Sequence, residues 1–192
     1  LGARDAMIRI RGYRRSWPDT FERIRVSLLG ILSPLALRID HIGSTSVPGM
    51  AAKDVIDVQV TVEALTSAVT AQLVDAGYQY KSHVTHDHVP AGEDPDPKLW
   101  RKLFFIQPEG ERRANLHVRA AGKPNQQYPL LFRDYLRAHP DAARTIERIK
   151  RELAGRFAND VDAYYAIKDL VYDLVWRAAQ AWESHGKRSA GE

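Results

Sequence analysis

The stretch HIGSTSVPGMAAKDVIDVQVTV, residues 41–62, constrains the fold most, because a turn rich in small residues leads into a β-branched strand. Along that strand apolar and polar residues alternate, so Ile56 belongs on one face and Asp57 and Gln59 belong on the other. A carboxylate flanked by apolar residues is costly in a core unless it is paired or binds a ligand. The pattern therefore predicts a sheet with one buried face and a polar site beside the turn on the opposite face.

The residues on either side of this stretch predict an α+β protein. Helical spacing of apolar residues indicates a helix over residues 16–32, and alternation indicates a strand over residues 35–42 with Leu37 on its apolar side. The other expected elements are helices at 63–77, 130–139, 140–153 and 161–182 and a hairpin of strands at 102–107 and 114–120. The last helix has an apolar stripe formed by Ile167, Leu170, Val171, Leu174, Val175 and Ala178. This order predicts a mixed β-sheet with helices packed mainly on one side.

Length and composition limit the classes of protein that this chain can represent. Its 192 residues suffice for one sizeable core, so we expect a single domain over residues 1–192 with flexible ends at 1–12 and 185–192. The absence of cysteine excludes disulfides and thiolate zinc sites, and it fits a cytoplasmic location. No apolar run is long enough to span a bilayer, so no membrane partner is expected. The formal net charge of +4 suits a polyanionic ligand such as a nucleotide, but no dense basic stripe indicates specific nucleic-acid binding.

The turn at Gly43 and Ser44 has the composition of a phosphate-binding loop. Glycine lets the backbone approach a ligand, and serine offers a hydroxyl and an N–H group to phosphate oxygens. On the next strand, Asp57 is placed to hold Mg²⁺ against those phosphates, which makes Mg²⁺ the expected cofactor. The Gly-Lys-Ser/Thr ending of a P-loop is missing. A purely structural turn is the alternative, because Gly-Ser followed by Pro48-Gly49 is also typical of turns.

Several long segments carry a resemblance to a known family. Residues 41–62 resemble the signature of the GrpB family, and the likeness continues through WRKLFF, through ANLHVRAAGKPNQQYPLLFRDYLRAHP and into YYAIKDLV. The likeness covers most of the chain and is greatest to the GrpB-type domain that follows the kinase domain in actinobacterial dephospho-CoA kinases. It implies a nucleotidyltransferase-like fold, and it makes dephospho-CoA kinase a candidate protein partner.

Nucleotidyltransferases as a superfamily use a Gly-Ser turn, a strand with two acidic residues one apart, and a third acid on a later strand. The resemblance assigns Gly43 and Ser44 to the turn and Asp57 to the first acid. His117 lies on a later strand and is the second catalytic candidate beside Asp57. Gln59 stands at the position of the second acid, where a neutral amide is a poor ligand for a hard cation.

The resemblance thus implies a protein that binds a nucleotide or other phosphorylated small molecule, with Mg²⁺-dependent nucleotidyl transfer as its potential activity. The replacement of an acid by Gln59 keeps a second function open. In that alternative the chain is a non-catalytic module that assists a partner enzyme such as dephospho-CoA kinase.

The remaining candidates for contact with a nucleotide or phosphate are His41, Thr45, Lys53, Arg101 and Lys168. The histidine can contact phosphate or carry a proton, but it can equally fix the turn through a hydrogen bond. The lysines and the arginine can neutralise phosphate, although a solvated surface charge is the alternative for each of them. On the strand expected at 114–120, one face carries three polar residues that form either a site wall or a solvent-exposed surface: Asn115, His117 and Arg119.

The segment HVTHDH supplies His83, His86 and His88, which suggest a zinc hydrolase. Metallo-β-lactamases have the pattern His-x-His-x-Asp-His, and the match fails because Thr85 occupies the place of the second histidine. The segment leads into residues 85–98, whose proline, glycine and aspartate content indicates a long loop. We expect that loop to border the cleft and to become ordered when a ligand binds.

Overall fold

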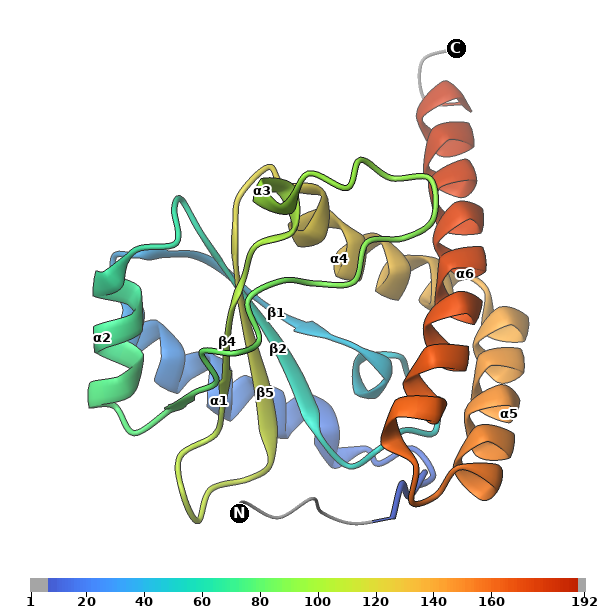
Figure 1. Cartoon of the computed structure of the whole chain (residues 1–192), viewed down its shortest axis with the longest axis horizontal. Helices are drawn as coiled ribbons and strands as arrows, with labels where there is room; N and C mark the ends of the chain where they lie inside the picture. The colour runs from blue at the N-terminus through green and yellow to red at the C-terminus, as the bar shows by residue number, and fades with distance from the viewer. Residues whose placement is uncertain (1–6, 190–192) are drawn as a thin grey trace.

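Five strands form one mixed sheet in the computed structural model of the chain, which describes residues 7–189, with side chains up to residue 186. The strand order is β1-β2-β5-β4-β3, with β2 and β5 parallel and all other neighbours antiparallel (Figure 1). The α+β class, the mixed sheet and the β4–β5 hairpin agree with the prediction. The strands are β1 Ala36–Ile42, β2 Ile56–Val62, β3 Gln79–Tyr80, β4 Leu103–Ile106 and β5 Ala114–Ala120.

The helices were mostly predicted, but two of them begin elsewhere than expected. The helix α2 begins later because the side chain of Thr66 accepts a hydrogen bond from the N–H of Val69 and so caps it. The helix α4 begins earlier, at Pro124, and proline suits the first turn of a helix. The described helices are α1 Ser16–Leu32, the short 3₁₀ turn η1 Ser44–Ser46, α2 Ser67–Asp75, α3 Pro97–Trp100, α4 Pro124–Ala138, α5 Pro140–Arg156 and α6 Val161–Ser189.

The strand β2 lies at the centre of the hydrophobic core. Its four alternate aliphatic residues from Ile56 to Val62 are each at most 1% exposed. They lie on the face of the sheet that α1 and α2 cover. The alternation predicted for this strand is therefore confirmed. In β1 the prediction for Leu37 is wrong, since this side chain is 59% exposed. The pairing of β1 with β2 shifts between Ala36 and Arg38, and such an irregularity re-aims the residue within it.

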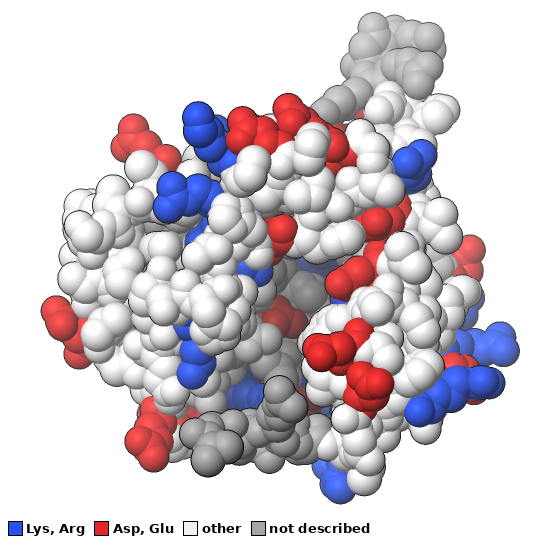
Figure 2. Space-filling view, in the orientation of Figure 1, with Lys and Arg blue, Asp and Glu red and all other residues white. Residues whose placement is uncertain are grey.

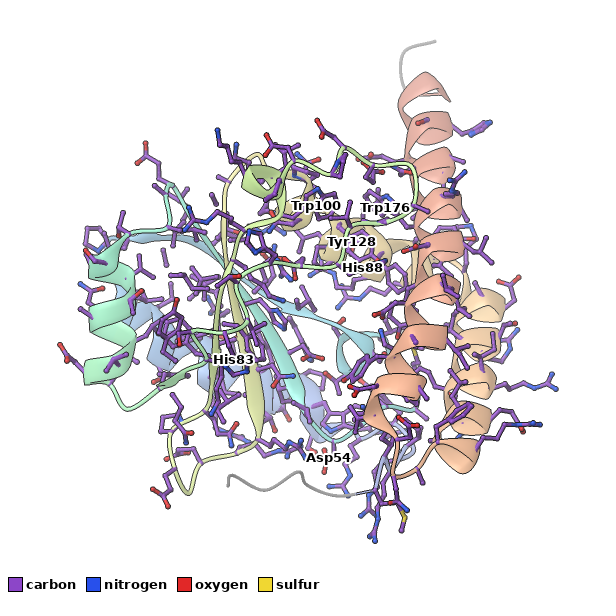
Figure 3. The ribbon with its side chains drawn as sticks, viewed as in Figure 1. Asp54, His83, His88, Trp100, Tyr128 and Trp176 are labelled. Carbon is purple, nitrogen blue, oxygen red and sulfur yellow. The ribbon has the colours of Figure 1, made fainter. Side chains whose placement is uncertain are left out.

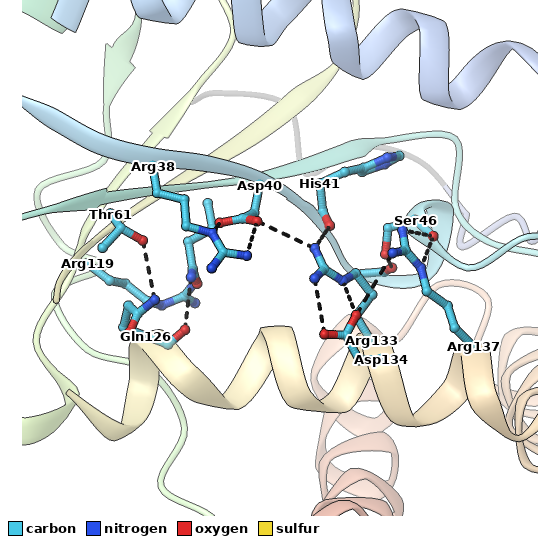
Figure 4. Close-up of polar contacts among 12 residues, drawn as sticks. Arg38, Asp40, His41, Ser46, Thr61, Arg119, Gln126, Arg133, Asp134 and Arg137 are labelled. Atoms are coloured by element: carbon cyan, nitrogen blue, oxygen red, sulfur yellow. Dashed lines mark hydrogen bonds and ion pairs between the residues drawn. The ribbon is translucent and has the colours of Figure 1, made fainter. Parts of the chain in front are cut away.

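The opposite face of the sheet is partly covered by α4, so helices lie on both faces. Arg133 Nη1 donates to the carbonyl of His41 at 3.0 Å, and Arg137 donates through Nε and Nη2 to the carbonyl of Ser46 at 3.1 and 2.8 Å (Figure 4). Near the start of the helix, Gln126 Nε2 donates to Thr61 Oγ1 at 3.4 Å. The helix α4 thereby fixes both the end of β1 and the turn that follows it.

The helices α5 and α6 stand side by side at the edge of the fold (Figure 1). The apolar stripe predicted for α6 is wrong in part, because Ile167, Leu170 and Leu174 are 39%, 65% and 70% exposed. The helix instead turns Trp176 toward α4, where its ring lies 4.7 Å from the ring of Tyr128. Aromatic side chains bury more area than aliphatic ones, and they decide which face of this helix packs inward.

A long connection leaves β3, reaches α6 and returns to β4 (Figure 1). His88 Nε2 lies 2.8 Å from Asp173 Oδ1 on α6, and Glu93 Oε1 accepts from Trp176 Nε1 and Gln180 Nε2, both at 2.8 Å. The loop predicted at 85–98 is present up to α3, and it ties the sheet to α6.

Parts of the segments expected to be flexible, 1–12 and 185–192, are described in the structure, and their flexibility stays a prediction. The backbone N–H of Ile8 donates to the carbonyl of Ala158 at 2.7 Å, and the Ile8 side chain is buried. At the other end, α6 continues to Ser189, while residues 1–6 and 190–192 lie outside the described residues. Within residues 7–189, the helices are too short or too polar to cross a lipid bilayer.

Candidate functional site

A cavity of about 700 Å³ opens between the sheet and the helices α4, α5 and α6. Figure 2 shows this face of the molecule hollowed between the part that carries the sheet and α6, with acidic and basic side chains near the opening. The structure thus brings the turn, β2, β5 and α6 together around one space. The predicted site residues that line it are Gly43, Ser44, Thr45, Lys53, Asp57, His117 and Lys168.

Gly43 and Asp57 are in direct contact at the floor of the cavity. Gly43 has φ 68° and ψ −174°, a conformation that is essentially restricted to glycine. A Cβ atom at this position would lie 2.5 Å from Asp57 Oδ2, so no larger residue fits without a shift. The requirement for glycine here therefore comes from the approach of the turn to the carboxylate.

Asn115 holds the other oxygen of this carboxylate. Parallel pairing places Asn115 opposite Asp57, and Asn115 Nδ2 donates to Asp57 Oδ1 at 2.9 Å. His117 Nε2 is 4.0 Å from the same oxygen. Enclosure raises the pKa of Asp57, while the Asn115 hydrogen bond and nearby lysines oppose the rise. Burial, followed by the charges of Arg119 and Lys102, lowers the pKa of His117 well below its ordinary value, so the imidazole is neutral.

Three lysines from separate segments border the cavity beside this floor. Lys150 of α5 is 4% exposed, and its Nζ donates to Ser44 Oγ at 2.8 Å and to the carbonyl of Ala51 at 3.1 Å. Burial lowers the pKa of Lys150. Lys168 of α6 forms an ion pair of 2.6 Å with Asp169. The hydroxyl of Ser44, predicted to hold phosphate, is thus already oriented by a buried cation.

Lys53 lies at the same end of the cavity. Its Nζ donates to the hydroxyl of Tyr165 at 3.2 Å and lies 4.5 and 4.6 Å from the ring centroids of Tyr164 and Tyr165. Burial is the main cause that lowers the pKa of Lys53 to about 8. The charges of Lys168, Lys150 and Arg113 add to the fall, and Asp57 opposes it. An anion bound nearby would stabilise the charged form of Lys53.

Aromatic rings form much of the remaining wall. Lys168 Nζ lies 3.9 Å from the centre of the Tyr172 ring, and that ring is 4.8 Å from Phe132. Tyr128 continues the wall toward the loop, and Figure 3 shows it near His88 and Trp176. Such rings can stack on a planar base or pack along an apolar chain. The cavity therefore combines a cationic end with an aromatic wall.

Gln59 lies outside the cavity, contrary to its expected role as a nucleotide contact. The side chain is fully buried beneath α4, where Gln59 Nε2 donates to the carbonyl of Gln126 at 2.9 Å. Its Oε1 accepts from Arg119 Nη1 at 2.7 Å. Both ends of the amide are used, and the amide joins β2 to β5 and to α4. The alternation of β2 placed Gln59 on the same face as Asp57, but α4 covers that part of the face.

Asp87 anchors the long loop beside the cavity. Its carboxylate accepts from Arg119 Nε and Nη2, both at 2.8 Å, from Lys102 Nζ at 2.7 Å and from Asn125 Nδ2 at 3.1 Å. The two cations, with these hydrogen bonds, hold the pKa of Asp87 well below its usual value although burial acts in the opposite direction. The loop thus borders the cavity through Asp87 and His88, and its ordering on ligand binding stays a prediction.

His41 and Arg101 also lie outside the cavity lining. The ring of His41 stacks on Phe21 of α1 at 4.7 Å, and His41 Nε2 is 2.9 Å from Thr45 Oγ1. Burial, with Arg137 and Arg133 nearby, lowers the pKa of His41 to about 4, so this histidine is neutral and fixes the turn. The side chain of Arg101 is exposed, which agrees with the surface-charge alternative.

The three histidines of HVTHDH do not form a metal centre. His88 pairs with Asp173, whereas His86 Nδ1 is 2.8 Å from Thr85 Oγ1. Figure 3 shows His83 well apart from His88. Across residues 7–189, no group of three or more His, Asp or Glu side chains is arranged to hold a metal ion. The zinc-hydrolase alternative therefore lacks a ligand set in the described part of the chain.

The residues around Asp57 do not fit the pair of Mg²⁺ ions used by nucleotidyltransferases. Among the described acids that line the cavity, Asp87 and Asp169 are engaged in ion pairs with basic side chains. Asn115 presents its NH₂ group, not its oxygen, to Asp57. A hard cation prefers several oxygen ligands, and a single carboxylate surrounded by lysines offers a poor site for even one such ion.

Lys150 was missed at the level of sequence, although its position carries a signal. It occupies the apolar stripe of α5, four residues after Ile146 and three before Leu153, both of which are buried. A charged side chain at a core position of an amphipathic helix destabilises the fold unless it is paired or binds a ligand.

The profile of the GrpB protein family matches residues 7–177. The chain belongs to the GrpB family. The crystal structure of the conserved protein GrpB from Enterococcus faecalis aligns with a TM-score of 0.70 and 26% identity, over 91% of this chain and 99% of that one. The predicted family is confirmed, and the α+β fold of the chain is that of the Enterococcus faecalis GrpB protein.

The chain is also similar to proteins of two different lengths. The dephospho-CoA kinase of Mycolicibacterium paratuberculosis is 38% identical over 180 residues, which cover 86% of this chain and 44% of that protein. A UPF0157 protein of Halalkalibacterium halodurans is 30% identical over 183 residues, which cover 94% of this chain and 87% of that protein. The chain therefore spans less than half the length of its relatives that are named as kinases.

Proposed function

We propose that this member of the GrpB family binds a nucleotide or another phosphorylated small molecule in the cavity. The observation that carries the proposal is the contact of the buried Lys150 ammonium with Ser44 Oγ at 2.8 Å, with Lys53 lining the same space. Phosphate oxygens accept hydrogen bonds from ammonium and hydroxyl groups, and such charge-assisted bonds are about twice as strong as neutral ones.

The two parts of the cavity have different roles in this proposal. The turn at Gly43 and Ser44 and the lysines hold the phosphate, while Tyr172 and Tyr128 pack against the organic part of the ligand. Mg²⁺-dependent nucleotidyl transfer in this cavity would need an acidic metal ligand in place of Gln59, which is buried with both ends of its amide hydrogen-bonded.

A second candidate function is a non-catalytic module that assists dephospho-CoA kinase. It is favoured by the name of the mycobacterial relatives, of whose length this chain spans 44–46%. It is also favoured by the exposed Leu170 and Leu174 on α6, since large apolar side chains at a surface often mark protein contacts.

A thermal-shift panel tests the first proposal. Nucleotides, CoA precursors and their dephosphorylated counterparts would be compared with and without Mg²⁺. A ligand at a hundredfold excess over its Kd stabilises the native state by about 2.7 kcal/mol, which such curves detect. We expect shifts for phosphorylated compounds alone, and a roughly tenfold loss of affinity in Ser44→Ala because a hydrogen bond to a charged group is lost.

The matched control for that variant is Ser27→Ala on the exposed side of α1, which should bind as the parent does. If no phosphorylated compound in the panel shifts the parent protein, the binding proposal fails. The assisting-module function then takes its place, tested by the effect of this protein on the activity and melting of dephospho-CoA kinase.

A further inference from the structure

We infer that the phosphate end of the cavity binds its anion without a metal ion, with Lys53 and Lys150 supplying the positive charge. The ligand class is a phosphate or diphosphate group carried as the free anion. The inference rests on the proposed function for the existence of such a ligand. It goes beyond that function because lysine side chains take the place of the Mg²⁺ expected from the resemblance.

The first step of the argument concerns what faces Asp57. In nucleotidyltransferases a second acid lies two residues after the first. Here that position is occupied by Gln59, and both ends of its amide form hydrogen bonds inside the protein. The nearest groups are instead the NH₂ of Asn115 and, at 4.0 Å, a neutral His117. Neither group is an oxygen donor of the kind that Mg²⁺ prefers.

The second step concerns cations that lack an acidic partner. Within residues 7–189, neither Lys53 nor Lys150 has a carboxylate at ion-pair distance; their contacts are hydroxyls, one carbonyl and aromatic rings. Holding an ammonium group in such surroundings is costly unless a counter-charge is present for part of the time. A bound anion provides that counter-charge.

The third step concerns donors that remain available. An ammonium group has three N–H donors, and the described contacts of Lys150 use two of them. Lys53 uses one on Tyr165. Both side chains line the cavity, together with Arg113. The remaining donors suit phosphate oxygens, which accept several hydrogen bonds at once.

Binding of phosphate through Mg²⁺ and binding through lysines alone predict opposite effects of Asp57→Asn on affinity. If Asp57 holds Mg²⁺, then Asp57→Asn removes the metal and abolishes tight binding. If the lysines bind the anion directly, the Asp57 carboxylate repels it, and Asp57→Asn tightens binding, by roughly threefold for a unit charge at about 6 Å in water. Asn keeps the shape and can still accept the hydrogen bond from Asn115.

Calorimetric titration with inorganic pyrophosphate and with ADP, in EDTA and in excess Mg²⁺, tests the inference. We expect binding in EDTA at least as tight as in Mg²⁺, because a bound Mg²⁺ neutralises the charge that the lysines recognise. Asp57→Asn should tighten binding in EDTA, and Lys53→Met should weaken it by tenfold or more. Lys98→Met, an exposed lysine on α3, is the matched control and should have no effect.

Binding that requires Mg²⁺, or that Asp57→Asn abolishes, overturns the inference while leaving the proposed function intact. Failure of both probes to bind in either condition also overturns it, and the wider panel of phosphorylated compounds then decides the proposed function separately. Lys53→Met is preferred to Lys150→Met because Lys53 is only partly buried, so its loss is expected to leave the protein folded.

Discussion

Replacing Gly43 with alanine should destabilise the protein through two separate costs. A non-glycine residue in this region of backbone space costs about 1–3 kcal/mol. The new Cβ atom also lies 2.5 Å from Asp57 Oδ2, and relieving such an overlap in a packed site costs about 1–3 kcal/mol more. The free energy of unfolding should therefore fall by roughly 2–6 kcal/mol.

Urea denaturation measures this loss as a lower midpoint at an unchanged slope. For a chain of this size each kcal/mol also lowers Tm by about 2–4 °C, so the change is large in a melting curve. Gly30→Ala is the matched control. Gly30 lies within α1 with nothing within 4 Å of its would-be Cβ, and this change should stabilise the protein by about 0.5–1 kcal/mol.

The double variant Gly43→Ala with Asp57→Ala separates the two costs. Removing the carboxylate relieves its overlap with the new methyl group but leaves the backbone strain, so the two substitutions should be less than additive. The reasoning is refuted if Gly43→Ala unfolds at the same urea concentration as the parent. Strict additivity in the double variant would show that the contact with Asp57 carries no cost.

Three further outcomes are expected. Gln59→Glu should lower the free energy of unfolding by about 1–3 kcal/mol, because the new carboxylate faces the Gln126 carbonyl, and calorimetry should detect no new Mg²⁺ binding. Asp87→Asn should cost about 3–5 kcal/mol at pH 7, since Arg119 loses its buried counter-charge. Folding lowers the pKa of Asp87, so the carboxylate adds to the free energy of unfolding above the unfolded-state pKa near 4, and this stabilisation is lost as the pH falls below that value. Urea titrations at pH 7 and pH 3 should therefore show a smaller loss of unfolding free energy for Asp87→Asn than for the parent. Phosphate affinity, measured by calorimetry, should fall as pH rises through about 8, where Lys53 loses its proton, and an affinity that stays constant or increases there would count against a lysine contact.

The sequence predicted the face of each residue on β2 but not what covers that face. Alternation placed Asp57 and Gln59 together, and both do point away from the α1 side of the sheet. Only the packing of α4 decides that one of them borders the cavity and the other is buried, and that packing depends on distant residues such as Gln126 and Arg133. Strand periodicity carries no information about such contacts.

The error in α6 has a different origin. Its aliphatic residues, such as Leu170 and Leu174, have helical spacing, and a hydrophobic stripe usually indicates the buried face. The helix instead buries Tyr164 and Trp176 together with the charged Asp173, which pairs with His88 of the long loop. Pairing between a helix and a loop more than eighty residues away is invisible to a pattern that counts only neighbours along one helix.

The parallel seam between β2 and β5 has a consequence for how the protein folds. Asp57 belongs to the antiparallel pair β1–β2, with Gly43 in the turn that follows β1, whereas Asn115 and His117 belong to the hairpin β4–β5. Each antiparallel pair joins strands that are close in sequence, but the hydrogen bond from Asn115 to Asp57 closes a separation of 58 residues. Closing so long a loop is entropically unfavourable, so docking of the two pairs is a natural late step in folding. A ligand that spans the seam would then contact only the docked state, and it would lengthen the lifetime of the folded protein without speeding its formation.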